Sequence, residues 1–166
     1  MFYRSTADLP PFEDYRMENR TYRYFRGDPL FPFGHGLSYT NFAYANLHMS
    51  ARNIKAGEPL TVSVEVTNTG ERAGDEVVQL YVSDIEASIR VPIRQLQGFA
   101  RIHLQPGESQ TVTFDLQASQ FALIDNAGQQ VIEPGRFQIA VGGQQPSLGA
   151  LAGTTDKVLV DVVDVH

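Results

Sequence analysis

Apolar and polar side chains alternate with a period of two along most of the chain after residue 41. In residues 60–67, LTVSVEVT, every second side chain is Leu or Val, and Thr, Ser or Glu stands between them. Because successive side chains of a strand point to opposite faces, this stretch predicts a strand with one face on a core and the other in water. Further strands are predicted at residues 42–49, 75–83, 96–104, 110–116, 136–141 and 157–163.

The stretch at residues 75–83, DEVVQLYVS, departs from this simple alternation. One face of the predicted strand is wholly aliphatic in its middle, and the other, with Val77, Gln79 and Tyr81, is also partly apolar. Apolar character on both faces is typical of a strand that is central in its sheet or covered on both sides. We therefore expect this strand to be buried on both faces.

Short runs of turn-forming residues separate the predicted strands. They are Asn68-Thr69-Gly70, Gln105-Pro106-Gly107, residues 125–128 and Glu133-Pro134-Gly135. About seven short strands with turn signals every 8–12 residues or so are typical of an immunoglobulin-like or fibronectin type III-like β-sandwich. The predicted fold class is therefore all-β, with this sandwich over residues 42–166. A short helical stretch is predicted at residues 117–122, and a loop rich in Gly and Gln at residues 142–154.

Residues 1–41 show no sustained period and are predicted to form an extended, irregular interdomain connector that ends in a docking plug. The plug is residues 30–40, LFPFGHGLSYT, where proline and glycine set the path of the backbone between large apolar side chains. Each of these side chains contributes roughly 1.5–3 kcal/mol when fully covered, so the plug needs a surface to lie against. The side chains that we expect to dock are Tyr22, Tyr24, Phe25, Phe31, Phe33, His35, Leu37 and Tyr39.

The length of the chain and its net charge limit the classes of function that we consider. At 166 residues the chain accommodates one β domain and its connector, and it leaves little room for a second complete domain. The formal net charge of -6 disfavours a nucleic-acid partner, because phosphate binding needs clustered Lys and Arg. Four arginines do cluster in the connector, and we expect them to pair with carboxylates of a neighbouring domain or to stack on aromatic rings. They are Arg16, Arg20, Arg23 and Arg26.

The chain has no cysteine, so it forms neither a disulfide nor a thiolate metal site, and its redox compartment is not determined. No stretch approaches the roughly 20 apolar residues of a membrane span, and the first ten residues lack the features of a signal peptide. We therefore expect no membrane partner. If the protein is exported, its signal lies outside this sequence.

Candidate catalytic carboxylates are few. The acidic doublets Glu13-Asp14 and Asp75-Glu76 consist of adjacent residues, whose side chains point to opposite sides of an extended chain. Neither doublet therefore forms the facing pair of carboxylates that glycoside hydrolysis needs. Asp125, beside an Asn and a Gly, is interpreted as a turn former.

The four histidines lie far apart along the chain and match no metal-ligand spacing, so we expect no metal and no other cofactor. They are His35, His48, His103 and His166. His35 lies between two glycines, and its predicted role is a hydrogen bond that locks the plug. No nucleophile elbow and no phosphate-binding loop is present in the sequence. Tyr22, Tyr24 and Tyr39 offer faces for sugar stacking, but aromatic residues of a proline-rich connector are expected to hold domains together.

Four blocks of sequence carry a family resemblance. They are LFPFGHGLSYTNF, VSVEVTNTGERAGDEVVQLYVSD, VPIRQLQGFARIHLQPGESQTVTFDL and LIDNAGQQVIEPGRFQIAVGG, in that order. Together they resemble the C-terminal fibronectin type III-like domain of family 3 glycoside hydrolases, which are β-glucosidases, β-xylosidases and their relatives. The resemblance covers residues 30–143, and the preceding segment is similar to the connector of bacterial members. The matching positions are Phe31, Phe33, Gly34, His35, Gly36, Leu37, Tyr39, Asn68, Gly70, Gly74, Gln79, Tyr81, Gly98, Phe99, Pro106 and Gly107.

The resemblance implies a retaining double displacement in the parent enzyme, with its nucleophile in a (β/α)₈ barrel and its acid/base in an α/β sandwich domain. In the family, both domains precede the segment seen here. The Ser-Asp-Trp core of the nucleophile motif is absent and the chain has no tryptophan, so no catalytic residue of the family is assigned to this chain. The segment departs from the family at Ala122-Leu123-Ile124, where relatives often place a further aromatic residue.

These observations predict a non-catalytic structural domain of a retaining β-glycosidase, inert by itself, that stabilises the parent enzyme and its domain packing or oligomer. Its expected partners are the barrel and the α/β sandwich domain, and without them its exposed aromatics are expected to drive self-association or a swapped connector. The alternative is an independent β-sandwich module that binds carbohydrate or a cell surface. A third reading is an intact enzyme with an unfamiliar site.

The resemblance implies a periplasmic or extracellular parent, with the cytoplasm as the alternative. It leaves the choice among glucosides, xylosides and arabinosides open, because the residues that set this specificity belong largely to the catalytic domains.

Overall fold

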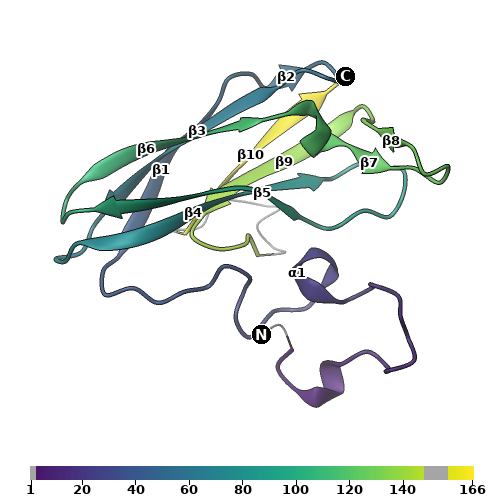
Figure 1. Ribbon diagram of the computed structural model, residues 1–166, viewed down its shortest axis with the longest axis horizontal. Coiled ribbons are helices and arrows are strands. Elements are labelled where there is room, and N and C mark those ends of the chain that lie inside the picture. Colours follow the sequence, from purple (N-terminus) through teal and green to yellow (C-terminus); the bar gives the residue numbers. More distant parts are fainter. Residues whose placement is uncertain (1–2, 148–156) are drawn as a thin grey trace.

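The computed structural model describes residues 3–147 and 157–166 (Figure 1). The strands within these residues are β1 (Phe42–Met49), β2 (Asn53–Ile54), β3 (Leu60–Asn68), β4 (Gly74–Asp84), β5 (Gln95–Leu104), β6 (Ser109–Leu116), β7 (Leu123–Ile124), β8 (Gln130–Val131), β9 (Gly135–Gly142) and β10 (Val158–Val165). The helix α1 (Thr21–Tyr24) is a single turn, and 3-10 turns lie at Thr6–Asp8 and Ala118–Phe121. The predicted all-β fold class is confirmed.

The strands form two layers that face each other (Figure 1). One sheet has the strand order β1-β3-β6 and the larger one has the order β2-β10-β9-β4-β5, with a small β7-β8 pair in addition. The pairings of the described strands are antiparallel, except that β2 runs parallel to β10. This two-layer arrangement is the predicted sandwich.

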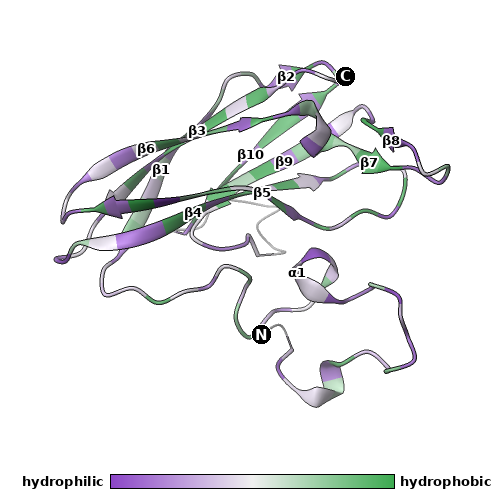
Figure 2. Cartoon of the chain, in the orientation of Figure 1, coloured by the Kyte–Doolittle hydropathy of each residue, from purple (hydrophilic) through white to green (hydrophobic). Residues whose placement is uncertain are grey.

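The hydrophobic core lies between the two sheets, where Figure 2 shows the apolar stretches of the strands. The alternate residues of β3 from Leu60 to Val66 are at most 1% exposed. They share one apolar cluster with Val78 and Leu80 of β4 and with Ile139 of β9. Since apolar burial stabilises by about 25 cal/mol for each Å² removed from water, this interior holds the sandwich together.

Each of the strands predicted from periodicity overlaps an observed strand and agrees with it within two residues at either end. The two-residue strands β2, β7 and β8 were not predicted, because they are too short to show a period. The predicted helical stretch at residues 117–122 is the 3-10 turn Ala118–Phe121. Residues 148–156 of the predicted Gly- and Gln-rich loop lie outside the described residues.

The side chain of Asp125 organises the turn between β7 and β8. Its Oδ1 accepts the backbone N–H groups of Ala127 and Gln129 at 2.9 and 2.8 Å. Gly128 completes the turn with a φ of 77°, in the region that favours glycine. The interpretation of Asp125 as a turn former is confirmed.

The connector precedes β1, which begins at Phe42, and in Figure 1 it lies below the larger sheet. The sequence predicts an extended chain here, whereas the structure contains the turn α1 and a 3-10 turn. A helix of four residues is too short to produce an amphipathic period, which is why the pattern missed it. Among the described residues, no helix is long and apolar enough to cross a membrane.

Candidate docking surface

Part of the larger sheet is buried on both faces. Besides the core between the sheets, a second apolar cluster forms on its outer face around Tyr81, Ala140 and Val158, with Tyr22 packed against it. Tyr81 has no exposed surface at all. The predicted two-sided burial of β4 is therefore confirmed from Val78 to Ser83, where the connector supplies the cover, whereas Val77 on the outer face is 39% exposed.

Tyr22 of α1 and Phe33 of the plug cover this outer face together. Their rings are stacked, with centroids 4.2 Å apart and planes inclined by 15°. The Tyr22 ring also meets Tyr81 edge-on at 6.3 Å, and its hydroxyl accepts the backbone N–H of Leu96 at 3.2 Å. Because one face of the Tyr22 ring is occupied by Phe33, that face is not open to a sugar.

Gly34 contacts the side-chain amide of Gln79, which the larger sheet directs toward the plug. The amide of Gln79 donates through Nε2 to the carbonyl oxygens of Gly143 at 2.9 Å and Gly34 at 3.4 Å, and its Oε1 accepts the hydroxyl of Tyr81. A Cβ at Gly34 would lie 2.1 Å from Gln79 Oε1, and the φ of Gly34 is +81°. Only glycine therefore lets the plug approach the sheet this closely.

Backbone hydrogen bonds anchor the connector at further points. The carbonyl oxygen of Phe33 accepts the N–H of Gln145 at 2.9 Å, and that of Arg23 accepts the N–H of Ile93 at 2.7 Å. At the end of the plug, the buried hydroxyl of Thr40 donates to Asn68 Oδ1 at 2.6 Å. The path of the plug is thus fixed by this domain alone.

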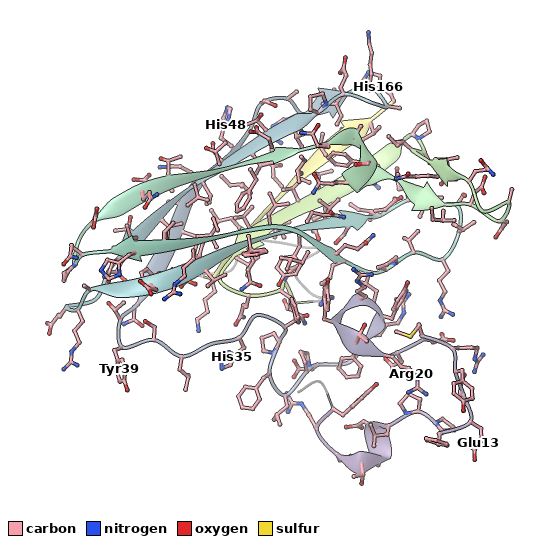
Figure 3. All side chains as sticks on the ribbon, in the orientation of Figure 1. Glu13, Arg20, His35, Tyr39, His48 and His166 are labelled. Carbon is pink, nitrogen blue, oxygen red and sulfur yellow. The ribbon has the colours of Figure 1, made fainter. Side chains whose placement is uncertain are left out.

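The other side of the plug is exposed. Leu37 and Tyr39 are 95% and 92% exposed, and Phe31 is about half exposed. Figure 3 shows Tyr39 and His35 pointing away from the sheets. Phe33 itself keeps 37% of its surface exposed, although it stacks on Tyr22. The plug is therefore bound on one side and open on the other.

The remaining predicted docking residues lie elsewhere in the connector. Phe25 is buried and meets Tyr3 edge-on, with ring centroids 5.4 Å apart. Tyr24 is half-buried and lines a cavity of about 300 Å³ together with Phe121 and Phe137. Phe25 and Tyr24 are thus used within this chain, and they do not join the exposed side of the plug.

His35 is exposed, and its ring lies 5.1 Å from that of Phe31. Its backbone N–H donates to the carbonyl oxygen of Pro32 at 3.1 Å. The hydrogen bonds that hold the plug come from Gln79, from the Thr40 hydroxyl and from the backbone, so the predicted locking role of the His35 imidazole stays a prediction.

Most of the clustered arginines are engaged within the connector itself. Arg16 forms an ion pair with Asp14 at 2.8 Å, and hydrogen bonding from Arg16 lowers the pKa of Asp14 to about 2. Arg20 donates to the carbonyl oxygens of Arg16 and Pro11 at 3.1 and 3.2 Å. Arg23 lies 5.9 Å from the centroid of the ring of Tyr22. These contacts stiffen the connector rather than form an open anion site.

The second acidic doublet divides between two environments. Asp75 accepts hydrogen bonds from Arg101 and from His103, and this pairing lowers its pKa. Its neighbour Glu76 is partly buried, and burial raises its pKa. Figure 3 shows His48 and His166 on the far side of the molecule from His35. Within residues 3–147 and 157–166, no group of three or more His, Cys, Asp or Glu side chains is placed to hold a metal ion.

Sequence reasoning did not place Phe99, Phe12 and Tyr15 among the docking residues, yet they are 71%, 87% and 85% exposed. Phe99 of β5 is paired with Gln79 of β4, so it lies on the same outer face of the larger sheet as the plug. The period-two pattern of β5 offered the signal, because Phe99 falls out of phase with the buried Ile102 and Leu104. It extends the exposed apolar surface beyond the connector.

Comparisons with known proteins agree with this fold. A family model for the fibronectin type III-like domain matches residues 76–145. A β-xylosidase from Formosa agariphila is 49% identical over 121 residues, which is 73% of this chain and 17% of the relative. A thermostable β-glucosidase B from Acetivibrio thermocellus is 43% identical over 141 residues, which is 80% of this chain and 19% of the relative.

A solved structure of a similar protein also agrees with this fold. A β-glucosidase from Erythrobacter marinus superposes with a TM-score of 0.73 at 38% identity, over 87% of this chain and 18% of that one. The chain thus spans roughly a fifth of the length of the proteins that it matches.

Proposed function

Because the chain carries the C-terminal fibronectin type III-like domain of family 3 glycoside hydrolases, we propose that it is a non-catalytic domain that stabilises a larger, retaining β-glycosidase. Its partners are the catalytic barrel and the α/β sandwich domain of that enzyme. The observation that carries the proposal is the two-sided plug, with one side bound to this sandwich and the other exposed and apolar.

The exposed side has the properties of a preorganised interface. Gly34 and Thr40 are both hydrogen-bonded to the sandwich, so Leu37 between them is held on a short span of chain and loses little freedom on docking. Leu37 and Tyr39 together present large apolar surface that a monomeric protein rarely leaves uncovered. More than four-fifths of each of these two relatives lies outside the segment that matches this chain, which is ample to cover this surface.

The carboxylates argue for a domain that is inert by itself. Asp14 and Asp75 are held in ion pairs with Arg16 and Arg101, which lower the pKa of both carboxyl groups, so neither is suited to act as a general acid at neutral pH. We expect no turnover of aryl β-glucosides or aryl β-xylosides by this chain. Turnover that a point substitution in this chain abolishes would contradict the proposal.

A graft tests the stabilising role. In the β-glucosidase B of Acetivibrio thermocellus, the segment homologous to this chain would be deleted or replaced by it, and the melting temperature and activity measured. We expect the deletion to lower the melting temperature by roughly 5–10 °C, which corresponds to a few kcal/mol, and the graft to restore most of that loss.

The matched variants of the graft identify the surface. Leu37→Asp together with Tyr39→Asp should prevent the rescue, because two charged groups would be buried in an apolar contact. His48→Asp, on the opposite side of the sandwich, should leave the rescue intact. A deletion that costs no stability, or a rescue that Leu37→Asp and Tyr39→Asp do not affect, contradicts the proposed docking.

The chain alone should self-associate through the same surface. We expect sedimentation velocity to show concentration-dependent oligomers, and Leu37→Asp with Tyr39→Asp to return the chain to a monomer. A monomer at all concentrations would show that the exposed side is not adhesive.

A further inference from the structure

A cavity of about 390 Å³ lies where the plug meets the end of the sandwich. The plug lines it on one side with Gly34, His35, Gly36, Leu37, Ser38 and Thr40. Tyr44 of β1, Glu76 of β4 and Gly143, which follows β9, line it on the other. Its volume falls within the range of sites that bind small molecules, which is about 300–1,000 Å³.

Tyr44 contributes an unpaired polar group to this lining. Its hydroxyl is buried and has no hydrogen-bond partner among the described residues. Burial raises the pKa of Tyr44 far above its ordinary value, and the nearby Glu76 carboxylate raises it further, so the phenol keeps its proton. Because a buried polar group without a partner costs free energy, nearly all such groups are paired in folded proteins. The Tyr44 hydroxyl can therefore donate one hydrogen bond to a molecule in the cavity and accept another from it.

Glu76 lies next to this hydroxyl. A Cβ added to Gly143 would lie 3.2 Å from Glu76 Oε1 and 3.3 Å from the Tyr44 hydroxyl oxygen, so both oxygens flank the same glycine. The carboxylate accepts the N–H of its neighbour Val77 at 2.7 Å. Burial raises the pKa of Glu76, as expected for a carboxylate with little contact with water. Two oxygen atoms with unused hydrogen-bonding capacity thus border one gap.

The charges around the cavity select the class of ligand. Lys157 also lines it, and its positive charge acts on Glu76 against the effect of burial. Asp75 lines it too, but Arg101 pairs with its charge. One carboxylate and one ammonium group nearly cancel, so the cavity favours neither an anion nor a cation. An apolar ligand would leave the Tyr44 hydroxyl unpaired.

We propose that this cavity binds a neutral saccharide unit through Glu76 and the Tyr44 hydroxyl. A sugar hydroxyl donates and accepts at once, so it can pair with the phenol while a neighbouring hydroxyl donates to the carboxylate. Phe42, on the wall of the cavity, offers apolar surface to the C–H groups of the sugar ring. The site depends on side chains of this chain alone, and therefore it does not rest on the proposed scaffold role.

Titrations of the isotope-labelled chain with glucose, xylose, cellobiose and xylobiose, followed by NMR at concentrations where sedimentation velocity shows a monomer, test the site. We expect saturable shifts of the Tyr44, Glu76 and Gly143 amides at millimolar sugar. Tyr44→Phe and Glu76→Gln should each weaken binding about five- to tenfold, as expected for the loss of one hydrogen bond. Gly143→Val should abolish binding, because its side chain would fill the space beside both oxygens.

Matched controls separate the cavity from the rest of the surface. Tyr15→Phe and Glu71→Gln change the same kinds of group at exposed positions and should bind as the unchanged chain does. Glucuronate and glucosamine should bind more weakly than glucose, because each adds a charge. The NMR spectrum of each variant reports whether it is folded.

Three results would overturn the proposal. The first is the absence of saturable shifts with all four sugars. The second is binding that Tyr44→Phe and Glu76→Gln leave unchanged, including shifts confined to Tyr22 and Tyr24 of the connector. The third is a charged sugar that binds as tightly as glucose.

Discussion

The interior of the sandwich and the connector on its outer face use apolar side chains in different ways. Between the sheets, residues such as Leu60, Leu80 and Ile139 are completely enclosed by this chain. In the plug, Phe33 is packed against Tyr22, while Leu37 a few residues later is almost fully exposed. The interior is a core completed by this chain, and in the function proposed above the plug is one half of an interface. The comparison separates the side chains that are enclosed within the domain from those that remain exposed and that we propose to bind a partner.

Replacing one leucine of the core and one leucine of the plug should give the largest difference in the free energy of unfolding. Leu80→Ala creates a cavity in the core and should lower the free energy of unfolding by about 2–5 kcal/mol. Leu37→Ala removes an exposed side chain and should change it by less than about 0.5 kcal/mol. Urea denaturation of the two variants measures both. Equal losses would mean that Leu37 already packs against its own domain.

The attachment of the plug to the sheet is the next test of the comparison. Gly34→Ala forces a Cβ against the Gln79 amide at a positive φ, and should weaken the attachment by roughly 2 kcal/mol. Gly36→Ala is the matched control, because a Cβ there meets no atom within 4 Å. Native-state hydrogen exchange of Leu96 and Gln145, whose N–H groups bind Tyr22 and Phe33, should accelerate only in Gly34→Ala. Unchanged exchange would show that Gln79 moves aside without cost.

A single hydroxyl gives a smaller effect in the same place. Tyr81→Phe removes the donor to Gln79 Oε1 and leaves that oxygen unpaired beneath the plug. We expect a loss of about 1 kcal/mol in urea denaturation, with faster exchange in the connector than in the core. Tyr39→Phe, whose ring is exposed, should have no effect. A loss of the same size in both variants would contradict a specific role for the Tyr81 hydroxyl.

The sandwich was predictable from the sequence because burial of one strand face imposes a period of two. The regular alternation in β3 fixed both its existence and its inward face, and the two apolar faces of β4 indicated a cover on the outer side. The strands β2, β7 and β8 contain two residues each, and no period exists over such a length. Turn chemistry identified the loop at Asp125, since the side chain itself bonds the turn.

The large apolar side chains of the plug could be identified from the sequence, but the direction in which each of them points could not. In irregular backbone no period links a residue's position to its facing side, so Phe33 and Leu37 looked alike in the sequence. The contact between Gly34 and Gln79 joins residues 45 positions apart, and only the folded chain brings them together. The unpaired hydroxyl of Tyr44 could not be predicted from the sequence either, because it depends on the folded neighbours of Tyr44, which offer it no hydrogen-bond partner.

The smallest expected changes in stability come from replacing the adjacent carboxylates Asp75 and Glu76. These two residues extend the comparison to single charged groups. Asp75 lies on the outer face, where hydrogen bonds from Arg101 and then His103 lower its pKa below the ordinary 3.8. Such a group stabilises the fold above its unfolded pKa, and this contribution is lost as the pH falls through the lower folded value. Asp75→Asn should therefore destabilise the chain slightly at neutral pH and have no effect in strong acid. High salt should reduce the neutral-pH loss, because the pair is exposed.

Glu76 should show the opposite sign, because burial raises its pKa above the ordinary 4.5. At neutral pH the Glu76 carboxylate is charged in both states, but it is hydrated in the unfolded chain and partly removed from water in the folded one, which destabilises the fold. Below the ordinary pKa, Glu76 is protonated in both states and this effect disappears. Glu76→Gln should therefore stabilise the chain slightly near pH 7 and change nothing in acid, while its amide oxygen still accepts the N–H of Val77. Urea midpoints of both variants, measured from acid to neutral pH, test this pair. Shifts of the same sign at neutral pH would show that burial does not oppose the Glu76 charge.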